Sequence, residues 1–255
     1  MILSARRDIS QKLTRYLIIF ARHWKLIQIN NIAIIPARGG SKRIPRKNLI
    51  PILGVPIIAR TIENIRSSGV FTEIIVSTED EEIAEIATLY GARAEYRRPQ
   101  TLSDDFTTTK PVVIDAIEAY GISNPHSLVC VVYATSMLIK PVQYCDSSLL
   151  ASDLSHGEQL LAVKRFTHPV ERSFMNSPLG GLEYKWPEFS EKRTQDLPVS
   201  FFDCGQFYWA RQSTWVSSSP LIKRYGFPIG NFDAIDLDDI SDLKDLEILL
   251  KLKIE

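Results

Sequence analysis

Glycine, serine and positive charge are concentrated in one loop that follows a short apolar run. The run ends near Ile35, and the loop reads PARGGSKRIPRKN over residues 36–48. Adjacent glycines let the backbone turn tightly and approach a ligand closely, while the five cations within residues 38–47 suit a polyphosphate. The spacing matches neither the P-loop nor the dinucleotide fingerprint. A solvated basic turn is the alternative, but the position after an apolar run favours a triphosphate site.

Acidic residues form a second candidate site near the C-terminus, in the sequence DLDDISDL over residues 236–243. Asp236 and Asp238 are two residues apart, so in an extended chain their carboxylates project to the same side. Such oxygen ligands suit a hard cation such as Mg²⁺, whose remaining ligands would be water and phosphate. Asp239 and Asp242 are expected only to favour the start of the following helix, which is also the alternative for the whole cluster.

Bulk composition excludes several classes of protein. The 30 basic and 30 acidic residues cancel, which argues against a nucleic-acid partner or an anionic membrane surface. Cys130, Cys145 and Cys204 lack the spacing of a zinc site or a disulfide framework and favour a reducing compartment. The longest apolar run near the start, residues 16–21, is too short to span a bilayer. We therefore expect a cytoplasmic protein without stable membrane insertion.

Strand and helix patterns alternate along the first part of the chain. Apolar runs at residues 31–35, 73–77 and 127–133 are typical of buried parallel strands. Helical patterns follow at residues 56–68, 79–90 and 109–120, each closed by a glycine. This alternation predicts an α/β fold: a mostly parallel, Rossmann-like sheet with helices on both faces.

The rhythm changes after about residue 155. Strand patterns at 159–164 and 206–210 flank a stretch rich in proline, glycine, serine and aromatic residues. We expect an inserted β-rich arm at about residues 160–205, and a last helix at about 241–252. Residues 31–255 then form a single domain.

The first thirty residues stand apart from this pattern. Their basic sequence is compatible with a helix that touches anionic lipid, with a surface helix, or with a start codon assigned too early. We expect residues 1–30 to be a dispensable extension.

The sequence IIPARGGSKRIPRKN resembles the nucleotide-binding signature of the CMP-nonulosonic acid synthetases, the acylneuraminate cytidylyltransferase family. The resemblance runs from about Ile32 to the C-terminus. It implies a fold of the nucleotide-diphospho-sugar transferase type and an enzyme that joins CMP from CTP to a nine-carbon sugar acid. It also implies a set of CTP contacts in the loop: Arg38, Gly39, Gly40, Ser41, Lys42, Lys47 and Asn48.

Other residues match the family one by one. By analogy, Arg98 and Thr109 would recognise cytosine, although a helix N-cap is an alternative for the threonines near residue 109. Asp236 and Asp238 match the family's magnesium ligands, and Asp239 stands where the family usually has threonine, which puts the helix cap in doubt. Arg38, Lys42 and Lys47, together with the two aspartates, would be the catalytic groups. No general base is identified.

The sequences RTQDL and DCGQFYW, over residues 193–197 and 203–209, look like the pseudaminic acid branch of this family. Tyr133 also replaces a glutamine that is typical of sialic acid enzymes. Sialic or legionaminic acid as substrate remains an alternative, as does a non-catalytic nucleotide-binding homologue. The family implies a homodimer through the arm. The expected sugar contacts are Thr135, Arg193, Gln195, Asp203 and Gln206.

Overall fold

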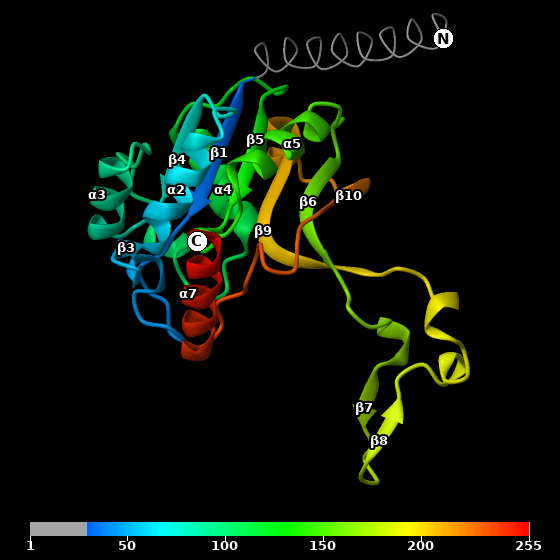
Figure 1. Ribbon diagram of the computed structural model, residues 1–255. Helices are drawn as coiled ribbons and strands as arrows, with labels where there is room; N and C mark the ends of the chain where they lie inside the picture. The colour runs from blue at the N-terminus through cyan, green and yellow to red at the C-terminus, as the bar shows by residue number, and fades with distance from the viewer. Residues whose placement is uncertain (1–29, 255) are drawn as a thin grey trace, which may run out of the picture.

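The computed structural model describes residues 30–254, and our expectations for the N-terminal extension fall almost entirely outside that range. Six strands form one central sheet in the order β10-β6-β9-β5-β1-β4 (Figure 1). Their bounds are β1 (Asn31–Pro36), β4 (Glu73–Ser77), β5 (Leu128–Val132), β6 (Glu158–Arg165), β9 (Phe201–Arg211) and β10 (Lys223–Pro228).

Strand direction confirms a mostly parallel sheet. β1 pairs in parallel with both β4 and β5, and β10 pairs in parallel with β6. β9 is antiparallel to its neighbours β5 and β6, so β6 and β10 point the same way as β5. The reversed β9 therefore begins at the edge of the sheet where β1, β4 and β5 end.

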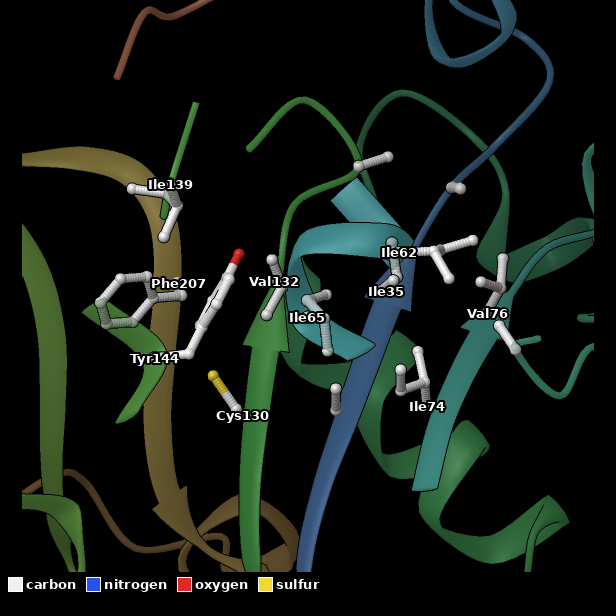
Figure 2. Close-up of a cluster of buried hydrophobic side chains, with 14 of the residues drawn as sticks. Ile35, Ile62, Ile65, Ile74, Val76, Cys130, Val132, Ile139, Tyr144 and Phe207 are labelled. Atoms are coloured by element: carbon white, nitrogen blue, oxygen red, sulfur yellow. The ribbon is translucent and has the colours of Figure 1, made fainter. Parts of the chain in front are cut away.

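Helices cover both faces of the sheet, as predicted. α2 (Ile57–Ser67), α3 (Glu81–Leu89) and α5 (Pro141–Ala151) pack on the face that carries Ala33 and Ile35 of β1. α4 (Thr109–Ala119) and α6 (Gln212–Val216) pack on the face that carries Ile32 and Ile34. Both faces of β1 are covered, so its sequence is continuously apolar. Figure 2 shows part of the first cluster, with Tyr144 and Phe207 on one side of Cys130.

Helix ends follow local signals in the sequence. Asp80 caps α3, because its carboxylate accepts a hydrogen bond from the Ile83 amide at 3.0 Å. The glycines after α2, α3 and α4 have positive φ values of 68°, 92° and 65° at Gly69, Gly91 and Gly121. Our sequence analysis missed α5, whose buried positions include Ser147 and Ser148 and therefore show no clear apolar stripe.

A third apolar cluster joins the C-terminal helix α7 (Ile240–Ile254) to the loop after β1. Ile44 of that loop packs in one cluster with Leu237, Leu246 and Leu250. Figure 1 shows α7 beside this loop. Two segments nearly 200 residues apart in sequence thus share one hydrophobic core.

The inserted arm leaves the sheet after β6 and returns at β9 (Figure 1). Its only regular strands within the described range, β7 (Phe174–Asn176) and β8 (Leu182–Tyr184), pair as an antiparallel hairpin. Much of its apolar surface is open, since Leu179 is 95% exposed and Leu182 is 66% exposed. The remaining short elements are β2 (Pro51–Ile52) and β3 (Val55–Pro56), which also pair antiparallel. Among residues 30–254, no helix is both long and apolar enough to cross a membrane.

Candidate functional site

Four segments meet at the edge of the sheet where the parallel strands end. They are the basic loop after β1, the turn at Thr78 after β4, the loop at Tyr133 after β5, and the first half of β9. The Tyr133 amide donates to the Gln206 carbonyl at 3.0 Å and so fixes the last two against each other. Ligands of open α/β sheets bind at this kind of edge.

The basic loop is held by hydrogen bonds at several points. Asn48, which is 8% exposed, donates its side-chain amide to the Arg38 carbonyl at 3.0 Å and closes the loop across its base. Arg46 has a left-handed backbone, with φ 55°, and its guanidinium pairs with the Asp80 carboxylate, including an Nη2–Oδ1 contact of 3.1 Å. These contacts tie the loop across its base and to the start of α3.

The two glycines of the loop differ in their surroundings, and neither has positive φ. A Cβ atom at Gly39 would lie 3.0 Å from the carboxyl carbon of Asp80 and collide with its oxygen. A Cβ atom at Gly40 would meet nothing within 4 Å. Neither glycine is therefore required by a left-handed backbone: Gly39 is needed for close packing on Asp80, and the space beside Gly40 is open.

Glu79 is a site residue that our sequence analysis did not identify. Its Oε1 accepts a hydrogen bond from the Gly39 amide at 2.8 Å, and its Oε2 accepts one from Arg98 Nη2 at 2.9 Å. Arg98 also donates from Nε to Ser103 Oγ at 3.0 Å. The sequence pattern places Glu79 only at the start of a helix. The available signal was an acidic residue two positions after the end of a buried strand.

Asp105 is a second residue that the sequence analysis missed. Arg38 Nη1 lies 2.7 Å from Asp105 Oδ1, and Lys42 pairs with the other oxygen of the same carboxylate. These two partners, Lys42 first and then Arg38, lower the pKa of Asp105. Arg38 also donates to the Asp104 carbonyl at 2.7 Å. The segment before α4 therefore lies against the basic loop.

The acidic segment before α7 meets the basic loop. Lys47 donates from Nζ to the Leu237 carbonyl at 2.8 Å, and Arg43 Nη1 lies 2.6 Å from Asp238 Oδ1. Burial lowers the pKa of Lys47, and the charge of Asp236 opposes that shift. Partial burial, followed by the charge of Asp238, raises the pKa of Asp236. Positive and negative groups are thus combined in one site.

The other two aspartates of this segment organise the start of α7, as predicted. Asp242 Oδ2 accepts hydrogen bonds from the amides of Asp238 and Asp239, at 2.7 and 2.8 Å. Asp239 Oδ1 accepts one from the Ser241 amide at 2.7 Å. The cap is therefore intact with aspartate at position 239. In the described part of the chain, no group of three or more His, Cys, Asp or Glu side chains is arranged to hold a metal.

Hydroxyl groups link the start of α4 to β9. Thr109 Oγ1 and Tyr133 Oη share a hydrogen bond of 2.9 Å, and the Tyr133 ring lies edge-on to Tyr208 with centroids 5.7 Å apart. Tyr208 donates to Asp203 Oδ1 at 2.8 Å, and burial raises its pKa. Thr108 precedes α4 but makes no side-chain cap. The expected cytosine contact at Thr109 and the expected sugar contact at Asp203 are therefore connected through two tyrosines.

Gln206 has an unsatisfied acceptor at the same edge of the sheet. The residue is 1% exposed, and its Nε2 donates to the Cys204 carbonyl at 2.9 Å. Its Oε1 is buried without a hydrogen-bond partner. A buried acceptor of this kind is costly unless a ligand or water pairs with it. Thr135 lies in the adjacent loop, half-buried, and Ser136 Oγ donates to the Gln206 carbonyl at 2.9 Å.

Arg193 and Gln195 are not brought to this edge within one chain. Both lie in the arm, which projects away from the sheet in Figure 1. Both are exposed, and Arg193 pairs with Asp196, with an Nε–Oδ2 distance of 2.7 Å. Their assignment to the sugar site remains a prediction.

The chain is similar in sequence to several known cytidylyltransferases. A family model described as cytidylyltransferase matches residues 32–146. A pseudaminic acid cytidylyltransferase of Campylobacter jejuni subsp. jejuni serotype O:2 is 36% identical over 230 residues, which cover 89% of this chain and 99% of that relative. A CMP-N,N'-diacetyllegionaminic acid synthase of Legionella pneumophila is 42% identical over 86 residues, or 34% of this chain and 37% of that protein.

Solved structures show the same fold at low sequence identity. A CMP:2-keto-3-deoxy-manno-octonic acid synthetase in complex with CTP has a TM-score of 0.64 and 14% identity, covering 88% of this chain and 99% of that one. A 4-diphosphocytidyl-2C-methyl-D-erythritol synthase from Anaerococcus prevotii has a TM-score of 0.62 and 12% identity, covering 89% and 98%. The α/β fold class expected from the sequence is confirmed.

Proposed function

The chain belongs to the cytidylyltransferase family, and from this premise we propose that it transfers CMP from CTP to pseudaminic acid and releases pyrophosphate. The observation that carries the proposal is the hydrogen bond from Lys47 to the Leu237 carbonyl. It brings the basic loop, which suits phosphate, and the carboxylates of Asp236 and Asp238 into one site. The sugar is suggested by the Campylobacter relative, which matches along nearly its whole length.

CTP would lie along the basic loop. Arg38, Lys42 and Lys47 would offset charge on the phosphates, and the open space beside Gly40 leaves room for the ligand. Ser41 and Asn48 complete the proposed loop contacts. The Gly39 amide already donates to Glu79, so Gly39 would contact the nucleotide through its Cα surface.

Cytosine would lie between Arg98 and Thr109. Their hydrogen-bonding groups suit the O2 and N3 acceptors and the N4 donor of the base. Arg98 is 4% exposed and already anchored by Glu79 and Ser103. Because the guanidinium is held in place, it cannot move to form hydrogen bonds with a mismatched base, and it can therefore discriminate between bases.

Asp236 and Asp238 fit a magnesium site. Two neighbouring carboxylates would supply hard oxygen ligands. Burial and then the charge of Asp238 raise the pKa of Asp236, and a bound cation would lower it again by favouring the ionised carboxylate. Water and phosphate oxygens would supply the remaining ligands. When bound, the ion would neutralise phosphate charge at the reacting centre.

The chain's own residues then act by positioning. The anomeric hydroxyl of the sugar attacks the α-phosphorus in line and releases its proton to solvent. The bond between the α-phosphorus and the oxygen that it shares with the β-phosphorus breaks, and pyrophosphate leaves. The anchored loop and Arg98 hold the nucleotide in one register, while Asp203, Thr135 and Gln206 orient the sugar. The unpartnered Oε1 of Gln206 would accept a hydrogen bond from a hydroxyl or acetamido group of the sugar.

We further propose a cytoplasmic homodimer assembled through the arm. The exposed side chains of Phe174, Met175 and Leu182 support it, at 52%, 47% and 66% exposed, because apolar surface of this kind marks interfaces. The position of Arg193 also supports a dimer, because this residue lies on the arm and is remote from the site of its own chain. In a dimer it would reach the carboxylate of the sugar bound to the second copy.

The test is release of pyrophosphate from CTP by the purified full chain, with and without pseudaminic acid. The proposal predicts release that requires both the sugar acid and a divalent cation. Tight CTP binding without any sugar-dependent release would contradict it and would favour a nucleotide-binding module.

A further inference from the structure

We infer that Glu79 is a positioning residue that fixes the phosphate loop and the cytosine-recognising arginine relative to each other. The inference rests on the proposed function, because it assigns Gly39 to the phosphate end of CTP and Arg98 to the base. Glu79 itself is not expected to touch the nucleotide.

The geometry of Glu79 is that of a bridge. Each of its two carboxylate oxygens accepts a hydrogen bond from a different partner. Oε1 accepts from the Gly39 amide at 2.8 Å, and Oε2 accepts from Arg98 Nη2 at 2.9 Å. Gly39 belongs to the loop after β1, while Arg98 lies 59 residues further along the chain. One side chain thus sets the separation between segments that would bind opposite ends of the same ligand.

Burial makes this bridge rigid. The Arg98 side chain is 3% exposed and that of Glu79 is 11% exposed. A charge-assisted hydrogen bond shielded from water is stronger than an exposed one, and breaking one partner leaves the other charge buried without compensation. Burial therefore favours a single geometry for the pair.

Glu81 provides a matched control on the same stretch of chain. It pairs with Arg97, the neighbour of Arg98, at 2.7 Å, but the side chains of this pair are 69% and 35% exposed. No hydrogen bond joins Glu81 to the loop in the described residues. Exposed ion pairs contribute little, so Glu81→Gln should change neither nucleotide affinity nor base selectivity.

The experiment is calorimetric binding of CTP and of UTP to the full-length protein and to its variants. Glu79→Gln keeps the side-chain size, but its amide N–H group would face one of the two donors, the Gly39 amide or Arg98 Nη2. One of the two hydrogen bonds would therefore be lost. We expect CTP affinity to fall about tenfold or more, the loss typical of a charge-assisted hydrogen bond. The preference for CTP over UTP should narrow at the same time, because Arg98 is no longer held in place. A purely structural role would not change base selectivity.

Glu79→Asp is a second variant that tests the inference if Glu79→Gln does not fold. It keeps the buried charge on a stem one methylene shorter, which cannot span both partners, and CTP affinity should fall several-fold. Unchanged CTP affinity and selectivity in a folded Glu79 variant would overturn the inference and leave the proposed function standing. Failure of the unmodified protein to bind CTP would overturn both.

Discussion

Lys47 donates a hydrogen bond of 2.8 Å to the backbone carbonyl of Leu237, a residue 190 positions away in the sequence. The contact places the last cation of the basic loop beside Asp236, which contributes to the pKa of Lys47. Leu237 also packs with Ile44 of the loop in one buried cluster. The proposed phosphate-binding and metal-binding groups are therefore held together by the hydrophobic core as well as by charge.

Replacing Lys47 should weaken CTP binding strongly. Lys47→Met keeps the aliphatic stem but removes a half-buried ammonium, and the loss of a charge-assisted contact of about 1.5–3 kcal/mol corresponds to at least a tenfold fall in affinity. Calorimetry with CTP measures this. Lys244→Met, an exposed change on α7, is the control and should bind CTP normally. Equal affinities in both variants would remove Lys47 from the site.

The aspartates before α7 should separate into two functional groups. Asp236→Asn and Asp238→Asn each remove one charge from the proposed metal site, so each should abolish most turnover, with partial recovery at high magnesium. Asp242→Asn should leave turnover nearly intact and cost at most about 1 kcal/mol of stability, because Asp242 serves the start of the helix. Steady-state kinetics over a magnesium series distinguish them. If all three variants behaved alike, the metal assignment would fail.

The Arg46–Asp80 pair should stabilise the protein only while Asp80 is ionised. The hydrogen bond from Arg46 is the main cause of the lowered pKa of Asp80. A carboxyl whose pKa is lower in the folded state stabilises it above the unfolded pKa of about 3.9, and this contribution is lost as pH falls through the folded pKa.

Asp80→Asn retains a capping side chain and removes the charge. It should lower the free energy of unfolding by about 1 kcal/mol at pH 7. Urea denaturation should show the same difference down to about pH 5 and a smaller one below about pH 4. Glu85→Gln on the same helix is exposed and should show no such dependence. A difference independent of pH would mean that the charge of Asp80 does not stabilise the fold.

Gln206 should affect the sugar more than the nucleotide. Gln206→Met keeps the buried volume but removes the unpartnered Oε1 acceptor, so kcat/KM for pseudaminic acid should fall about tenfold or more while KM for CTP stays within about twofold. Gln212→Met is a matched control, because Gln212 is also buried but lies on α6 and bonds to Ile122. A loss confined to CTP, or an equal loss in both variants, would contradict the sugar assignment.

The sequence predicted the elements that are apolar throughout or strictly periodic. The buried strands at β1, β4 and β5 and the helices α2 and α4 were placed within a few residues, because burial on both faces and glycine stops leave clear local signals. α5 was missed since its buried face is half serine, and the antiparallel direction of β9 was missed since direction depends on the path of the arm and not on local pattern.

The candidate site was predicted where residue types alone suggest chemistry. Charge and spacing indicated the basic loop and the acidic segment, and the family resemblance assigned Lys47 and Asp236 within them. These two residues lie close enough for each to influence the pKa of the other. Glu79 and Asp105 were missed, because their significance is a long-range contact with Gly39 or Arg38 that a linear sequence does not display.

The measurement that tests the account most directly is kcat/KM for pseudaminic acid against kcat/KM for the common sialic acid, with CTP saturating and the CMP-sugar product identified by mass. A site that hydrogen-bonds particular substituents rejects an analogue that leaves buried groups such as Gln206 unpaired. Such a mismatch can lower kcat/KM by about 10⁴-fold. We expect pseudaminic acid to be preferred by at least about 100-fold. Comparable efficiency on both sugars would contradict the assignment of the substrate, and absence of any CMP-sugar product would contradict the assignment of the reaction itself.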